Sequence, residues 1–173
     1  MDNSPLMMIN NGLSIVSSKR GEQYNGLIVH AAFEVNAGGP AIVVAVNQNN
    51  LTYDYIKESS AFTVSILEQE TPMSLIGLFG FKSGRDTDKF AGVEYVMGKS
   101  GVPYVVTNSL AFIETQVIQT FNIASLTFFV GKIIHSGVLK EGLPLTTYHY
   151  QTVMNGKFPK TSSLHGEQML YFG

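Results

Sequence analysis

The stretch LTFFVGKII, residues 126–134, decides the fold of this chain. It is apolar on both faces of an extended backbone, which predicts a buried β-strand that also meets a partner surface. Gly131 interrupts the run, and we expect it to mark a β-bulge or a bend. The rest of the chain is expected to supply the strands that pack around this segment.

Similar patterns predict five more strands. Residues 41–46 (AIVVAV) form a near-continuous apolar run, so both faces of that strand should be buried. Residues 61–67 alternate between apolar and polar side chains, as a half-buried strand does. Weaker patterns predict strands at residues 13–16, 27–33 and 111–121. The first of these is expected to stop at a turn over residues 17–21.

Three short helices are predicted between the strands. The first is expected over residues 53–58, capped by Thr52. The second is expected to be capped by Thr71, to begin at Pro72 and to end before Gly80. The third is expected to begin after Arg85 and to end near Gly92. Many strands with small helical insertions indicate a mainly β protein built as an antiparallel barrel. The chain from residue 144 onward is expected to be an extended segment that wraps the domain or its neighbour.

Composition narrows the class of protein. The length of 173 residues predicts a single domain over residues 1–173. A hydrophobic content of 45% with only 14% charged residues predicts a large core and an apolar surface buried against a partner subunit. Net charge −2 argues against a nucleic-acid surface. We expect no membrane span and no signal peptide, and therefore a cytoplasmic protein.

Side-chain catalysis has no recognisable set of residues here. Cysteine is absent, which excludes thiol catalysis and thiolate metal sites. The four histidines, His30, His135, His149 and His165, lack the spacing of a zinc site, so no metal is expected. His30 and His149 are best explained as packed, partly buried side chains. Glu114 is better explained by a solvated strand face than by acid catalysis.

The loop GFKSGRDTDKF, residues 80–90, offers a site for a cofactor that would carry the chemistry instead. Its glycines let backbone N–H groups turn toward a ligand. Its three cations can donate charge-assisted hydrogen bonds to a phosphate. Composition alone favours a plain polar turn, because Gly–Ser–Arg loops are common. The phosphate-binding interpretation therefore depends on the segments around the loop.

Seven segments follow one another in a characteristic order: YNGLI (24–28), NNLT (49–52), FTVSIL (62–67), FGFKSGR (79–85), DKF (88–90), FVG (129–131) and GKFP (156–159). In this order and spacing the chain resembles the FMN-binding split-barrel family of flavin reductase-like domains. The resemblance spans nearly the whole chain. It indicates the subgroup that contains flavoredoxin, the flavin domain of high-molecular-weight rubredoxins, and archaeal ferric reductases.

The resemblance implies a Greek-key antiparallel split β-barrel with a few short helices. It also implies a homodimer with one FMN per subunit near the interface. NADH or NADPH would be the electron donor, and a flavin, ferric iron or a small redox protein would be the acceptor. Such an oxidoreductase needs positioning and stacking and no side-chain base, so no catalytic side chain is expected.

The family's site can be carried onto this sequence residue by residue. The loop over residues 83–85, with Lys89, would bind the phosphate, and residues 25–28 would line the isoalloxazine ring. Residues 46–48 and Thr52 would reach the ring edge, the ribityl chain or the phosphate. The residues expected to bind the cofactor are Asn25, Gly26, Leu27, Ile28, Val29, His30, Ala31, Val46, Asn47, Gln48, Thr52, Phe81, Ser83, Gly84, Arg85 and Lys89.

Three departures from the family pattern bear on function. His30 and Ala31 replace an Asn–Thr pair, and Gln48 replaces a lysine, so we expect FMN to be bound more loosely. Residues 123–128 lack the family's histidine, which motivates one alternative, a flavin-binding electron carrier without nicotinamide activity. A second alternative is a diverged split-barrel protein that binds another ligand, such as a haem or a different phosphate compound.

Overall fold

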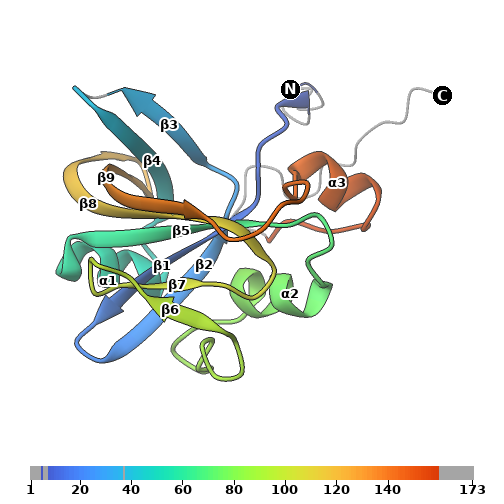
Figure 1. Ribbon diagram of the computed structural model, residues 1–173, viewed down its shortest axis with the longest axis horizontal. Coiled ribbons are helices and arrows are strands. Elements are labelled where there is room, and N and C mark those ends of the chain that lie inside the picture. Colours follow the sequence, from blue (N-terminus) through green and yellow to red (C-terminus); the bar gives the residue numbers. More distant parts are fainter. Residues whose placement is uncertain (1–4, 6–7, 37, 160–173) are drawn as a thin grey trace.

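The computed structural model describes residue 5, residues 8–36 and residues 38–159; His165 and the rest of the C-terminal segment lie outside these ranges. Strands dominate this part of the chain (Figure 1). The elements in chain order are β1 (Ser14–Arg20), β2 (Gln23–Val29), β3 (Ala32–Asn36), β4 (Pro40–Asn47), α1 (Leu51–Ser59), β5 (Ala61–Leu67), α2 (Met73–Phe81), β6 (Tyr95–Met97), β7 (Pro103–Val105), β8 (Ser109–Ile123), β9 (Leu126–Val138) and α3 (Thr147–Thr152).

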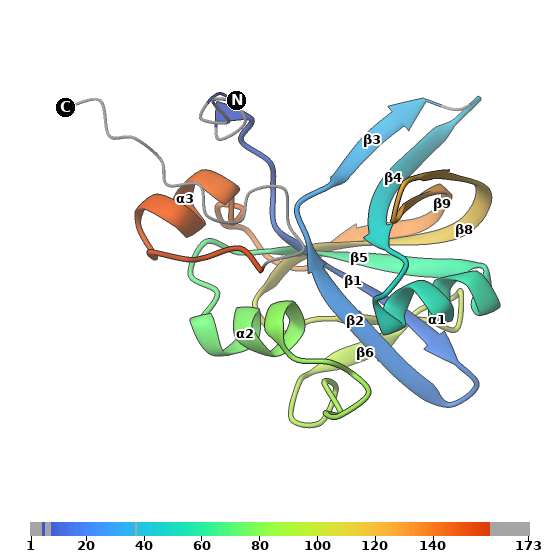
Figure 2. The same cartoon turned by 180° about the vertical axis from the view of Figure 1, so that it is seen from behind.

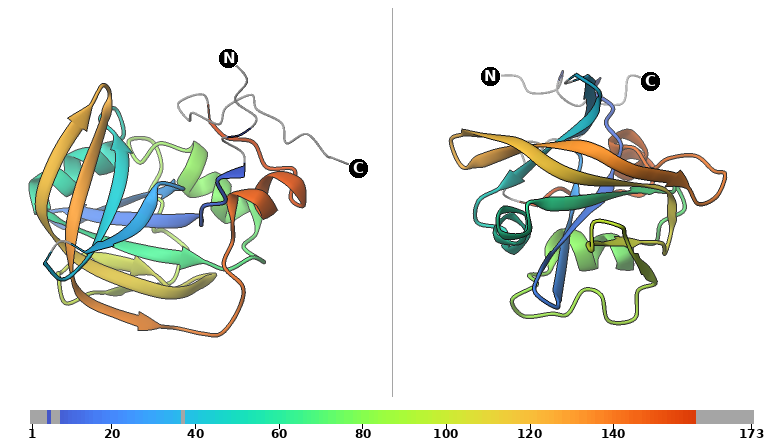
Figure 3. Two further views of the ribbon diagram at one scale, coloured as in Figure 1. Left: turned by 90° about the horizontal axis from the view of Figure 1, so that it is seen from above. Right: turned by 60° about the vertical axis from the view of Figure 1, so that its left-hand side comes forward.

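Seven strands form one antiparallel sheet in the order β2-β1-β5-β8-β9-β4-β3, and β6 and β7 form a separate ribbon. β2 and β3 lie at opposite edges of this sheet, yet only His30 and Ala31 separate them in the chain. The chain itself therefore joins the two edges there, and the hydrogen bond from Ala45 N to Ala31 O (3.0 Å) extends the β3–β4 ladder to this junction. The sheet curls into a barrel that is joined at this point (Figure 3). The predicted mainly β, antiparallel split barrel is confirmed.

Gly131 lies at a β-bulge, as predicted. It pairs with Val117, and the next pair along the ladder joins Val130 to Gln119, so Ile118 is one extra residue on β8. A side chain at position 131 would place its Cβ 2.6 Å from Thr115 Cβ. Glycine therefore lets β9 pass close to β8 where the strands bend.

The interior is divided between two apolar clusters. The barrel cluster is formed by inward-facing strand residues and one residue of α1: Val16, Val29, Ile42, Val44, Val46, Ile56, Phe62, Val64 and Phe129. The second cluster joins α2 to the start of β1 and to the chain around α3: Leu13, Ile15, Leu67, Leu75, Ile76, Phe79, Phe90, Val105, Leu145, Tyr150 and Phe158. Viewed from behind, β2 runs between α2 and α1 (Figure 2).

The two predicted helix caps are wrong. Asn50, and not Thr52, occupies the cap position of α1, and Thr52 lies buried in the first turn. Its hydroxyl accepts a hydrogen bond from Asn25 Nδ2 (3.0 Å), so a tertiary contact uses the group that capping would need. Pro72 occupies the cap position of α2, which runs through Gly80 to Phe81. The Thr71 hydroxyl instead donates to Glu68 O (2.6 Å).

Several other boundaries also differ from the expectation. β1 continues to Arg20, and the expected strand over residues 27–33 is divided between β2 and β3. No helix follows Arg85; the chain turns there, with Ser83 O accepting from Asp86 N and Thr87 N. The segment after residue 144 is not extended throughout, because it contains α3, capped by the Thr146 hydroxyl. None of the described helices is long and apolar enough to cross a membrane.

Candidate functional site

A cavity of about 830 Å³ lies against β2. This volume falls within the roughly 300–1,000 Å³ typical of small-molecule sites. Its walls are formed by β2, the end of β4, the start of α1, α2 with the loop after it, the β8–β9 turn with the start of β9, and α3 with the segment after it; Leu13 also contributes. The lining residues that matter below are Asn25, Leu27, Ile28, His30, Thr52, Phe79, Lys82, Ser83, Gly84, Arg85, Lys89, Leu126, Phe128, Lys157 and Phe158.

Most of the residues expected to bind a cofactor line this cavity, including Val29, Ala31, Asn47 and Phe81. Three do not. Gly26 lies behind the wall, Val46 is buried in the barrel cluster, and Gln48 donates through Nε2 to Thr127 Oγ1 (3.2 Å). The structure thus brings together the NGLI strand and the loop at residues 83–85, which are far apart in sequence.

Lys89 is a buried cation in the cavity wall, with only 4% of its surface exposed. Nζ donates to Gly26 O (2.8 Å) and Phe79 O (3.3 Å), and it forms no ion pair with a described residue. Burial lowers the pKa of Lys89 from 10.5 to about 8. An ammonium has three donors, and two are used. A ligand that accepts a hydrogen bond here would meet an otherwise uncompensated charge.

The loop that carries Arg85 folds back on itself before the chain reaches Lys89. Arg85 N donates to Ser83 Oγ (3.1 Å), and Asp88 Oδ1 accepts from Phe90 N (2.9 Å). The Arg85 guanidinium donates to Asn49 O (3.3 Å) and lies 3.6 Å from Asp54 Oδ2. Both partners of that ion pair are well exposed, so the pair is worth roughly 0–1 kcal/mol. Arg85 can therefore turn to an anionic ligand with little penalty.

Asn25 joins this loop to β2. Its Nδ2 donates to Thr52 Oγ1, while its Oδ1 is buried without a hydrogen-bond partner. A Cβ at position 84 would overlap the Asn25 side-chain amide. Glycine is therefore required at position 84, because the loop backbone lies directly against the side chain of Asn25. The buried Oδ1 therefore lies against the loop backbone at Gly84.

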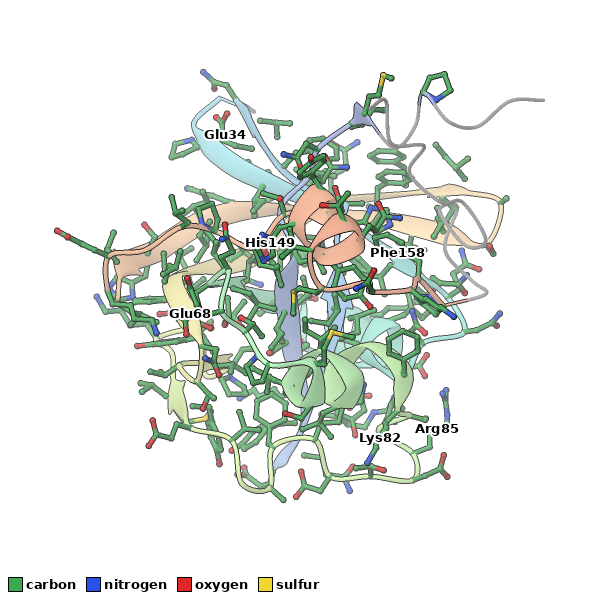
Figure 4. The ribbon with its side chains drawn as sticks, turned by 90° about the vertical axis from the view of Figure 1, so that its right-hand side faces the viewer. Glu34, Glu68, Lys82, Arg85, His149 and Phe158 are labelled. Atoms are coloured by element: carbon green, nitrogen blue, oxygen red, sulfur yellow. The ribbon has the colours of Figure 1, made fainter. Side chains whose placement is uncertain are left out.

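A short strap, residues 156–159, closes the cavity on the side of α3. Figure 4 shows Phe158 on the α3 side and Lys82 and Arg85 further along the same face of the molecule. The Phe158 ring packs edge-on against His30, with ring centroids 5.5 Å apart. Burial lowers the pKa of His30, which favours a neutral imidazole at the cavity wall. The expectation that His30 is packed and partly buried is confirmed.

Residues 6–156 match the family model described as "Flavin reductase like domain". The chain belongs to this family. It is 39% identical over 167 residues to a ferric-chelate reductase (NAD(P)H) of Archaeoglobus fulgidus, covering 96% of this chain and 99% of that protein. It is also 38% identical over 162 residues to a high molecular weight rubredoxin of Moorella thermoacetica, covering 94% of this chain and 71% of that protein.

The fold agrees with this membership. Flavoredoxin from Methanosarcina acetivorans superposes with a TM-score of 0.69 at 23% identity, covering 78% of this chain and 74% of that one. The resemblance to the subgroup of flavoredoxin, rubredoxin flavin domain and ferric reductase is therefore confirmed.

Some lining residues of this flavin reductase-like domain were absent from the predicted set. Leu126 and Phe128 enter from the start of β9, within the segment that lacks the family's histidine. Lys157 and Phe158 enter from the strap. The GKFP segment belonged to the resemblance, which was the signal that could have placed the strap in the site. The local sequence pattern of these β9 residues does not distinguish a side chain that lines a cavity from one that contacts a partner subunit.

Glu114 lies outside the site, and the expected solvated strand face is wrong for it. Its side chain is 1% exposed. Oε2 accepts from Ser100 N (3.0 Å) and Ser100 Oγ (3.1 Å), and Oε1 lies 2.7 Å from His135 Nδ1. Burial alone would raise the pKa of Glu114, but the hydrogen bonds from Ser100 and His135 lower it overall. Glu114 therefore ties the β6–β7 turn to the barrel.

Proposed function

We propose that this flavin reductase-like domain binds FMN and passes electrons through it from NADH or NADPH to an acceptor. The acceptor would be a flavin, ferric iron or a small redox protein. The observation that carries the proposal is the buried charge of Lys89, without an ion-pair partner among the described residues, beside a glycine-containing loop in a cavity with mostly apolar walls. The names of the two relatives, a ferric-chelate reductase (NAD(P)H) and a high molecular weight rubredoxin, support it.

The residues around the cavity match the chemistry of FMN. Its phosphate suits the loop end, where Arg85 and Lys89 supply charge. Its flat, mostly apolar ring system suits walls made by Leu27, Ile28 and Phe128. Position 31 offers no hydroxyl and Gln48 faces Thr127, so two contacts expected of the family are missing.

FMN, when bound, supplies the redox chemistry, accepting two electrons and a proton as a hydride and releasing the electrons to the acceptor. The chain's residues bind and orient. Lys89 and Arg85 fix the anionic end, and the apolar walls exclude water from the ring. The strap restricts the opening on the α3 side. No described side chain of the cavity is placed as an obligatory acid or base, which suits chemistry done by positioning.

The proposal includes a homodimer, and β8 supports it. Residues 111–116 of β8 pair with both β5 and β9, but Val117 and residues 119–123 pair only with β9. This leaves an open strand edge, which proteins usually cover. Ile118, Phe121 and Ile123 are exposed along it. A second subunit docked on this edge would bury them.

The exposed edge continues into the cavity rim. Phe121 stacks on Phe128 (centroids 4.8 Å apart), and Phe128 lines the cavity. A partner subunit covering the edge would therefore also border the cofactor. Because reduced nicotinamide nucleotides are kept inside cells, the proposal further places the protein in the cytoplasm, which cell fractionation can test.

The visible absorption spectrum of the purified protein tests the redox proposal. FMN is added first, then NADH or NADPH without oxygen, then dithionite. We expect a bound-flavin spectrum that bleaches with the nicotinamide. Bleaching by dithionite alone would favour an electron carrier, in keeping with the absent histidine near Phe128. Failure to bind FMN at all would contradict the proposal.

A further inference from the structure

The charged residues that line the cavity all have one sign. Lys82, Arg85, Lys89 and Lys157 face it, and no described Asp or Glu lines it. The whole chain has the opposite balance, with 13 acidic residues against 11 lysines and arginines. Such segregation focuses a positive field in the cavity and raises the local concentration of anions.

These cations come from two separate places in the fold. Lys82 and Arg85 belong to the loop after α2, and Lys89 is buried behind that loop. Lys157 belongs to the strap, and its neighbour Phe158 lies apart from Lys82 and Arg85 in Figure 4. FMN has one phosphate, which the loop end can bind by itself. The positive charge of Lys157 on the strap is therefore available to bind a second anion.

The backbone beneath Lys157 is firmly held. Tyr150 Oη donates to Lys157 O (2.9 Å), and Gly156 N donates to Tyr150 O (2.8 Å). A Cβ at position 156 would overlap the Tyr150 ring, which is itself buried. The side chain of Lys157 is exposed and forms no ion pair with a described residue. The strap thus presents a cation at the cavity rim without an ion-pair partner among the described residues.

We propose that Lys157 binds the diphosphate group of the nicotinamide nucleotide. This inference rests on the proposed function and names the group by which the electron donor is held. A dinucleotide that brings its nicotinamide into the cavity must leave its diphosphate nearer the rim. NADH and NADPH share that diphosphate, so Lys157 assists both and does not discriminate between them.

Adenosine diphosphate tests this, because it has the diphosphate and lacks the nicotinamide. It is titrated by calorimetry into FMN-loaded protein, as wild type, Lys157→Gln and Lys99→Gln. Lys99 is an exposed lysine in the β6–β7 turn, so its variant is the control for loss of one positive charge. We expect ADP to bind about fivefold more weakly to Lys157→Gln, the upper range for an exposed charge pair, and unchanged to Lys99→Gln.

FMN affinity, measured by flavin fluorescence, should be the same in all three proteins. In turnover, Lys157→Gln should raise the KM for NADH and NADPH by the same factor and leave kcat unchanged. Equal ADP affinity in wild type and Lys157→Gln, or no ADP binding to wild type, would overturn the assignment. Weaker FMN binding in Lys157→Gln would also overturn it, by placing Lys157 at the flavin phosphate. Failure of wild type to bind FMN would instead reject the proposed function itself.

Discussion

Replacement of Lys89 by methionine should weaken FMN binding in a way that depends on pH. Methionine fills a similar volume without the charge. At about pH 7 the lysine, with a pKa of about 8, is mostly protonated. Loss of a hydrogen bond to a charged group is worth roughly 1.5–3 kcal/mol, so Lys89→Met should bind FMN about 10- to 150-fold more weakly.

The pH dependence follows from the same pKa. Free wild-type protein at about pH 9 has roughly a tenth of Lys89 protonated, whereas a bound phosphate requires the charged form. Wild-type affinity should therefore fall about tenfold between pH 7 and pH 9. Lys89→Met should show no such fall. Arg85→Gln is the matched control, because it removes a cation that stays protonated throughout, so it should keep the wild-type slope.

The free energy of unfolding of the ligand-free protein should change with pH in the opposite direction to the FMN affinity. The pKa of Lys89 is lower in the fold than in the unfolded chain, so between about pH 8 and pH 10.5 the unfolded state binds more protons. The free energy of unfolding contributed by Lys89 should therefore rise with pH across that window and stay flat in Lys89→Met. Fluorescence titration and urea unfolding measure the two effects. A wild-type FMN affinity that is constant from pH 7 to pH 9, or a slope that survives in Lys89→Met, would refute the reasoning.

Three further outcomes are expected. Gly84→Ala should force the loop away from Asn25 and weaken FMN binding by about 1 kcal/mol or more, whereas Gly77→Ala, an open position in α2, should raise the melting temperature. Glu114→Gln should lower the free energy of unfolding by roughly 1.5–3 kcal/mol at neutral pH. Since the pKa of Glu114 is lowered in the fold, its stabilising effect is present above about pH 4.5 and lost as pH falls through the folded value, so variant and wild type should converge in acid urea unfolding. Phe121→Asp places a charge on the exposed β8 edge and should give a monomer by sedimentation. Val153→Asp, a control at an exposed position near α3, should stay dimeric. A monomeric wild type would reject the proposed dimer.

Regular patterns made the strands of the fold predictable. β5 has the predicted limits, residues 61–67, because alternation and neighbouring turns both indicate them. β4 is close to the predicted residues 41–46, because a strand buried on both faces needs a continuous apolar run. Thr52 was misassigned since a capping hydroxyl and a hydroxyl bound to a distant Asn25 look alike in sequence. Short exposed strands such as β6 have no periodic signal.

The candidate site was predictable where it is built from one contiguous motif. The loop around Arg85 and the NGLI strand had composition and order to indicate them. Glu114 was misjudged because its burial comes from the β6–β7 turn folding over it, a contact between residues 14 apart that no local pattern reports. The strap residues are placed by Tyr150, whose ring and hydroxyl fix the backbone of residues 156 and 157.

The junction at His30 and Ala31 has a consequence for kinetics. The same two residues hold the edges of the barrel together and line the cavity. Any fluctuation that parts β2 from β3 would therefore also widen the binding site. A bound cofactor would stabilise this junction, and its residence time would be limited by how often the two strands separate there. Cofactor dissociation and local unfolding would then have the same free-energy barrier.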